Sequence, residues 1–263
     1  MLKKLLKYDL ISIFKVLSIF YILSIVFAII TRMFLSIENS FILNIIAQIC
    51  SGTTISMIIN ILINNIMRLW VRFKQNLYGD ESYLTHTLPV TKISLYTSKF
   101  LTSLITLMTS MIVIVITIII AFYSKSNFDI IKNLITSLSN SYNISVIPYI
   151  IFVIIIFYLE LINLLQSGYT GIILGHKMNN YKILYSVLLG FITYIITQIF
   201  AILSILIFSL FNNDLIQLFK TSQLTDINLL KLLLIVSTIT YLLIIIIVKI
   251  TNIKLFKRGV NVD

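Results

Sequence analysis

Glu160 is an acidic residue inside a long apolar segment, where a charged side chain is unusual. A carboxylate in such surroundings is costly when ionised, so we expect Glu160 to be protonated, paired or in contact with water. One interpretation makes it a relay for protons or cations. The other makes it a protonated side chain that is hydrogen-bonded between helices. The second is favoured, because we see no second intramembrane ionisable group that would offer a relay.

Polar residues and one glycine recur every four residues in the segment 41–67. They are Asn44, Gln48, Gly52, Ser56, Asn60 and Asn64. A four-residue step drifts slowly around a helix, so these residues share one gently spiralling face, called the amide stripe below. Asn and Gln do not belong against lipid tails, so we expect the amide stripe to line a pathway or to contact another subunit. Two weaker stripes, at 98–109 and 190–204, fit contacts between helices of the same chain.

Catalytic and nucleotide-binding motifs are missing from the sequence. The glycine at 175 and Lys177 lack the spacing of a phosphate-binding loop, and His86 and His176 do not form a metal-binding arrangement. Asp80 and Glu81 are adjacent in a loop and point in different directions, so they are not a catalytic pair. We therefore expect no enzyme activity in this chain by itself and no cofactor bound to it.

Six long apolar segments must position these residues. The 263-residue chain is 59% hydrophobic and only 11% charged, whereas soluble proteins average about 25% charged residues. Each segment is long enough to cross a hydrocarbon layer of about 30 Å. They run about 10–31, 41–67, 93–122, 146–174, 183–211 and 229–250. The sequence therefore predicts an all-α polytopic membrane protein, with residues 1–263 forming one domain.

Cationic residues predict how the chain is oriented. Fifteen of the twenty Lys and Arg residues would lie on one side of the membrane if both termini lie in the cytoplasm. Residues 1–9 are expected to form an amphipathic helix in the interface before the first span. Outside, segments 128–140 and 214–226 are expected to be interfacial, with an ordinary loop as the alternative for each. The net charge of +11 fits this topology and attraction to anionic lipid better than nucleic-acid binding.

The cytoplasmic loop at about 68–92 contains a polar, turn-rich run, Gly-Asp-Glu-Ser-Tyr-Leu-Thr-His-Thr-Leu-Pro-Val, at residues 79–90. Ser98 and Lys99 follow at the start of the third span. This run resembles a stretch in bacterial permease subunits of the ABC-2 exporter type. The resemblance is strong over about a dozen residues and loose over the rest of the chain, through the interfacial helix and the six spans.

The resemblance implies a permease of the bacterial cytoplasmic membrane that pairs with a separate ATP-binding cassette subunit, which would hold ATP and Mg²⁺. A second permease, identical or related, would complete the transporter, and an amphipathic antimicrobial peptide or a drug would be the substrate. The loop would carry the coupling helix and pass movement to spans one, two and five. The coupling residues would be Gly79, Asp80, Glu81, Tyr83, Leu84, Thr85, Leu88 and Pro89.

Other functions remain open from the sequence. A secondary transporter or channel that uses Glu160 would need no ATPase, and a membrane scaffold would transport nothing. The less favoured alternative for the run 79–90 is a solvated connector without a partner. A neighbouring gene that encodes a phosphate-loop protein would favour the exporter.

Overall fold

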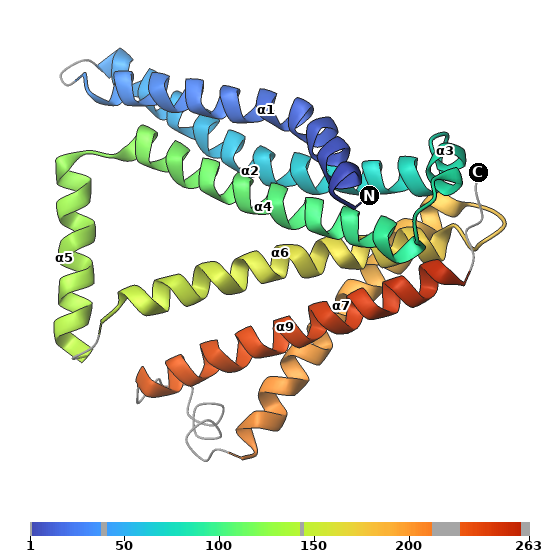
Figure 1. Ribbon diagram of the computed structural model, residues 1–263. Helices are drawn as coiled ribbons and strands as arrows, with labels where there is room; N and C mark the ends of the chain where they lie inside the picture. Colours follow the sequence, from blue (N-terminus) through green and yellow to red (C-terminus); the bar gives the residue numbers. More distant parts are fainter. Residues whose placement is uncertain (1, 38–40, 143–144, 212–226, 259–263) are drawn as a thin grey trace. The chain divides into compact units, whose positions relative to one another are not determined.

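The computed structural model describes residues 2–37, 41–142, 145–211 and 227–258, and these residues form helices without any strand (Figure 1). The helices are α1 (Leu2–Leu35), α2 (Phe41–Leu77), α3 (Ser82–Thr87), α4 (Lys92–Phe122), α5 (Lys125–Tyr142), α6 (Ile147–Gly175), α7 (Lys182–Ser209) and α9 (Ile227–Lys257). Six of them, α1, α2, α4, α6, α7 and α9, are long and apolar enough to cross a membrane. The prediction of a multi-pass, all-α membrane protein is confirmed at this level.

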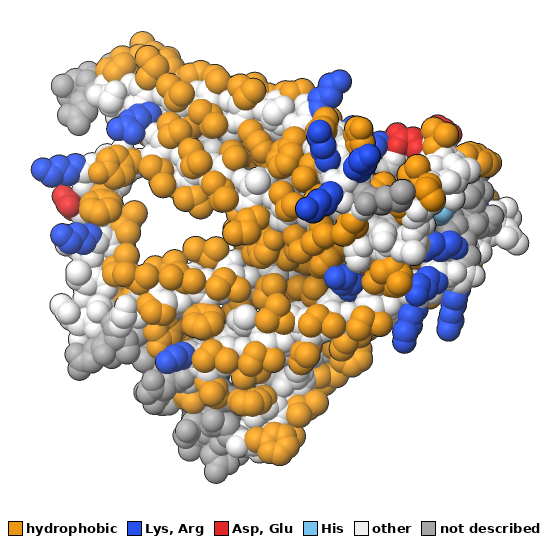
Figure 2. Space-filling view, viewed as in Figure 1, with side chains coloured by type: hydrophobic (Ala, Val, Ile, Leu, Met, Phe, Trp, Pro, Cys, Tyr) orange, Lys and Arg blue, Asp and Glu red, His pale blue; other side chains and the backbone are white. Residues whose placement is uncertain are grey.

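Apolar side chains follow the helices on the face that Figure 2 shows, with Lys and Arg gathered toward helix ends. The helices continue past several predicted ends: α2 reaches Leu77 rather than residue 67, and α9 reaches Lys257 rather than residue 250. Hydropathy ends a predicted span at the first cationic turn. The backbone need not end there, because Lys and Arg are good helix formers and their long side chains reach the interface from the last turns.

Residues 2–9 are the first turns of α1 and continue into the first span without a break (Figure 1). Their location in the membrane interface stays a prediction. The predicted outer segment 128–140 lies within α5, where Ser124 Oγ accepts a hydrogen bond from Asn127 N–H at 3.1 Å near the start of the helix. Phe128, Ile131 and Leu134 of α5 are exposed. The other outer segment, 214–226, lies outside the described residues.

The chain divides into two compact units, and the prediction of a single domain stays a prediction. Unit 1 comprises Met1–Arg72 and Ser94–Thr136, and unit 2 comprises Phe73–Ile93 and Ser137–Asp263. Unit 1 therefore contains α1, most of α2 and α4. Unit 2 contains the last turns of α2, the segment around α3, and α6, α7 and α9.

Hydroxyl and amide groups join the helices of unit 1. Tyr21 on α1 and Ser110 on α4 are hydrogen-bonded through their hydroxyls at 2.7 Å, and Asn65 Nδ2 on α2 donates to the same Ser110 Oγ at 2.7 Å. Thr31 on α1 and Thr54 on α2 share a hydroxyl bond of 2.8 Å. Such contacts are worth less than 1 kcal/mol each on average in membranes, so they orient the helices while apolar packing supplies most of the stability.

In unit 2, α6 packs against both α7 and α9. A Cβ atom on Gly171 would lie 2.3 Å from the Ser186 backbone oxygen, and one on Gly175 would lie 2.2 Å from Ser186 Oγ. Only glycine leaves room for α7 at these two positions, so α6 and α7 approach each other closely there. Across α6 and α9, Thr170 Oγ1 donates to Asn252 Oδ1 at 2.8 Å.

Candidate functional site

The turn after α2 depends on Gly79. The backbone N–H groups of Tyr78 and Gly79 both donate to Lys74 O, at 2.9 and 3.0 Å. A Cβ atom on Gly79 would lie only 3.2 Å from Gln75 Cα, so a larger residue would press on the backbone of the preceding turn. Ser82 N–H then donates to Gly79 O at 2.8 Å, and α3 begins. Gly79 therefore allows a tight reversal between α2 and α3.

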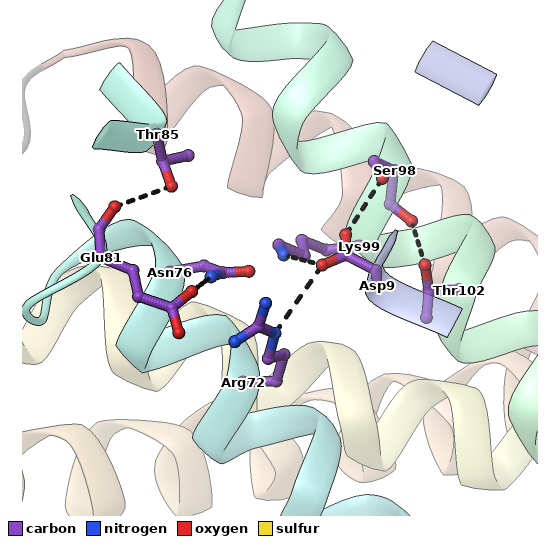
Figure 3. A network of polar contacts seen from close by, with 8 residues as sticks. All are labelled: Asp9, Arg72, Asn76, Glu81, Thr85, Ser98, Lys99 and Thr102. Atoms are coloured by element: carbon purple, nitrogen blue, oxygen red, sulfur yellow. Dashed lines mark hydrogen bonds and ion pairs between the residues drawn. The ribbon is translucent and has the colours of Figure 1, made fainter. Parts of the chain in front are cut away.

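Helix α3 is fixed at both ends. Glu81 occupies its N-cap, and its carboxylate accepts a hydrogen bond from the Asn76 amide at the end of α2 (Figure 3). Thr85 Oγ1 donates to Glu81 O at 2.9 Å. At the other end, Leu88 has the extended backbone (φ −64°, ψ 139°) that a residue before proline favours, so Pro89 helps to stop the helix after one and a half turns.

The outer side of α3 exposes most of the predicted coupling residues. Tyr83 is 67% exposed and Leu84 is 75% exposed, although they are an aromatic and an aliphatic side chain. Asp80, Glu81, Leu88 and Pro89 are exposed as well, whereas Gly79 and Thr85 are half-buried. The structure thus presents two apolar side chains with acidic neighbours on one short helix.

The inner side of α3 rests on residues that the sequence prediction missed. Ser82 is fully buried, and His86 Nε2 lies 3.1 Å from Leu77 O. The His86 ring is 6.1 Å from the ring of Phe256 near the end of α9. His86 and Phe256 lie far from each other in the sequence, and no periodic pattern links them. Residue spacing alone therefore could not predict this contact.

Tyr78 and His176 form a second contact that was not predicted. Their rings are 4.5 Å apart, and both side chains are almost completely buried. His176 follows the last residue of α6, and its Nδ1 lies 2.8 Å from Ile172 O. The sequence drew attention to His176 only as a residue without a metal-binding motif, whereas the structure gives it a packing role.

The amide stripe of α2 faces away from the interior of unit 1. Asn44, Gln48, Gly52, Ser56 and Asn60 are exposed, and Asn64 is half-buried. Apart from the adjoining backbone of α2 itself, no heavy atom among the described residues lies within 4 Å of a Cβ atom built on Gly52. The amides of Asn60 and Asn64 donate to the backbone oxygens of residues 56 and 60, at 3.0 and 2.9 Å. These two amides therefore bond to the backbone of their own helix.

Glu160 joins three helices of unit 2. Tyr194 Oη and Gln198 Nε2, both on α7, donate to Glu160 Oε1 at 2.6 Å each. Tyr241 on α9 donates to Gln198 Oε1 at 3.2 Å. This arrangement is what the interpretation of Glu160 as a hydrogen-bonded link between helices requires. Its function in transport stays a prediction.

A buried ion pair in unit 1 was not predicted. Asp9 on α1 is 5% exposed and accepts a hydrogen bond from Lys99 Nζ at 2.5 Å (Figure 3). Lys99 bonds to Asp9 Oδ1, and Ser98 Oγ donates to Asp9 Oδ2 at 3.2 Å. Arg72 Nε lies 3.9 Å from Asp9 Oδ1. Asp9 therefore holds the start of α1 to α2 and α4. It also gives the adjacent Ser98 and Lys99 one shared partner, which no local sequence pattern reveals.

Within the described ranges, no group of three or more His, Cys, Asp or Glu side chains could hold a metal ion. No family model, curated protein or solved structure matches this chain.

Proposed function

We propose that this chain is the membrane-spanning permease subunit of an ATP-driven ABC exporter in the bacterial cytoplasmic membrane, with both termini in the cytoplasm. A separate ATP-binding cassette subunit would hydrolyse ATP with Mg²⁺, and a second permease would complete the transporter. The substrate class would be an amphipathic molecule such as an antimicrobial peptide or a drug. The observation that carries this proposal is the two-sided α3, whose inner side is buried while Tyr83 and Leu84 are exposed.

The exposure of α3 has a physical cost that a partner would remove. Tyr83 and Leu84 follow the helical end of α2, where cationic residues have replaced apolar ones, so lipid tails do not cover them in the predicted topology. An aromatic and an aliphatic side chain within a polar rim are the usual centre of a protein interface. Asp80 and Glu81 supply that rim and would meet a cationic groove.

The amide stripe supports a transporter over an inert anchor. Exposed Asn and Gln side chains along a membrane-length helix are costly against hydrocarbon. Water in a pathway, or a second permease with its own polar groups, would form hydrogen bonds with these exposed amides. Both surroundings fit a two-permease exporter in which α2 borders the route of the substrate.

The proposal is tested with the Tyr83→Ala/Leu84→Ala double variant. We expect it to insert normally but to lose about 2–4 kcal/mol of binding to the ATP-binding subunit, which weakens the complex about 30-fold or more. Co-purification from membranes, followed by transport-coupled ATP hydrolysis in lipid vesicles, measures both steps. Parent-like binding and hydrolysis in this variant would mean that α3 is not the coupling element.

One control variant and one milder variant sharpen this test. Met178 and Tyr181 are exposed apolar residues in the other predicted cytoplasmic loop between spans, and Tyr181 has a left-handed backbone (φ 53°). Met178→Ala/Tyr181→Asn removes comparable side chains while keeping a residue that tolerates this conformation, and it should leave binding intact. Asp80→Asn should weaken binding mildly, with an effect that shrinks as salt rises. Glu81 is less suitable, because its carboxylate also holds Asn76.

A further inference from the structure

Resting on the proposed function, we propose that Tyr78, His176 and Phe256 form an aromatic seat through which a displacement of α3 is transmitted to α6 and α9. These three residues touch no substrate and act as positioning residues. The sequence led us to expect movement of spans one, two and five. The contacts within unit 2 point to spans four and six as receivers, with span five following span four, and movement of spans one and two stays a prediction.

The three side chains of the aromatic seat are buried and in contact through Tyr78. Tyr78 lies at its centre, 4.5 Å from the His176 ring and 6.4 Å from the Phe256 ring, which it meets edge-on. The exposed fractions of the three side chains are 1%, 0% and 0%. Burial raises the pKa of the Tyr78 phenol above its ordinary value of 10, so this side chain stays neutral at physiological pH. Close-packed interiors of this kind have low compressibility and transmit displacement.

The connection from α3 to the aromatic seat is short. His86 belongs to α3, and its ring faces Phe256 at 6.1 Å while its Nε2 meets Leu77 O. Behind Tyr78, Phe73 stacks on Tyr169 of α6, with ring centroids 4.1 Å apart and planes inclined by 16°. The end of α2, the short helix and the end of α6 are therefore joined by successive ring contacts.

The receiving helices are joined to each other close to the aromatic seat. Asn252 lies one turn before Phe256 and contacts α6 twice, accepting from Thr170 Oγ1 at 2.8 Å and donating to Gln166 O at 3.2 Å. Gly175, next to His176, packs directly on Ser186 of α7. A push on His176 or Phe256 therefore moves the cytoplasmic ends of α6, α7 and α9 together rather than one side chain alone.

Binding and transmission lie on opposite sides of α3, so separate variants should affect them. Phe256→Ala leaves Tyr83 and Leu84 exposed, and we expect the ATP-binding subunit to co-purify at the parent level. Transport per ATP hydrolysed should fall about tenfold or more, which corresponds to a coupling loss of at least 1.4 kcal/mol. Phe191→Ala is the matched control, because this α7 side chain is 62% exposed and lies outside the aromatic seat. It should leave both quantities unchanged.

A second measurement does not depend on activity or on the partner. Spin labels at Thr87→Cys on α3 and Lys177→Cys after α6, in a Cys50→Ser background, report the distance between two exposed sites of unit 2. The parent should give one narrow distance distribution in lipid nanodiscs. Phe256→Ala should broaden it, whereas Phe191→Ala should not. Tyr78→Phe keeps the ring and should preserve the narrow distribution.

The outcomes separate this inference from the proposed function. A broad distribution in the parent, or a narrow one in Phe256→Ala, overturns the aromatic seat even if the ATP-binding subunit docks. Parent-level coupling in Phe256→Ala overturns it as well. Failure of any ATP-binding subunit to bind the parent would instead overturn the proposed function, while the label distances would still decide whether α3 is seated on α6 and α9.

Discussion

At the residue scale, Glu160 separates the exporter from a secondary transporter or channel. Its Oε1 accepts two hydrogen bonds of 2.6 Å, from Tyr194 and Gln198. A glutamine at this position can still accept both through its carbonyl oxygen. Glutamine can therefore substitute for Glu160 if the function of the carboxyl group is to join α6 to α7.

We therefore expect Glu160→Gln to assemble normally and to retain most transport. Glu160→Ala should lower the melting temperature of the purified complex, because it leaves two half-buried donors, Tyr194 and Gln198, without their acceptor. Thermal unfolding in detergent and transport in vesicles are the measurements. A stably assembled Gln variant without transport would contradict the structural role and favour proton or cation movement through this site.

Single residues mark the limit of what the sequence could predict. Glu160 stood out because an acid inside an apolar run is conspicuous. Asp9 did not, since it lies at the edge of such a run and its partner Lys99 is on another helix. The sequence did not predict the contacts among Tyr78, His176 and Phe256 for the same reason. These contacts depend on how the ends of three helices lie beside one another, which no local pattern encodes.

At the element scale, the amide stripe of α2 makes a separate prediction. Replacing Gln48 and Asn60 by Leu should reduce transport strongly, because these exposed amides would no longer offer hydrogen bonds to water or to a second permease. Folding should be unaffected, since neither side chain is buried. Ile59→Leu, on an exposed apolar position nearby, is the control.

Transport assays and the oligomeric state in detergent distinguish the two possible roles of the stripe. Loss of transport with an intact pair of permeases indicates a pathway lining. Loss of the pair indicates a subunit contact. Unchanged transport and assembly would leave the stripe without either role.

The elements themselves were largely predictable, because six runs of apolar residues fix six long helices. Helix ends were not. The predicted second span ended ten residues before Leu77, as charged residues lower hydropathy without breaking backbone hydrogen bonds. Helix α3 could be expected only as part of a loop, and its two-sided character follows from Gly79, Pro89 and the aromatic contacts beneath it.

At the scale of the whole molecule, the distribution of cations predicts the topology. Single cysteines at Thr87 and Asn179, both exposed in the structure, should be shielded from an impermeant thiol reagent in intact cells. A cysteine at Asn127, which is exposed in the first turn of α5, should be labelled. Labelling in permeabilised cells is the control for all three sites. Labelling of Thr87→Cys from outside would reverse the orientation and remove the basis for docking an ATP-binding subunit in the cytoplasm.

The seating of α3 on Phe256 also affects how the protein is made. Residue 86 leaves the ribosome long before residue 256, by roughly 10–30 s at ordinary rates of bacterial synthesis. During that interval α3 has no support from α9, so the surface that we propose for an ATP-binding subunit is unfinished. Nascent chains stalled before residue 256 should accordingly be cut by protease after Thr87, where released chains resist. If the proposed function holds, assembly with the ATP-binding subunit would be reserved for chains in which α9 has been completed.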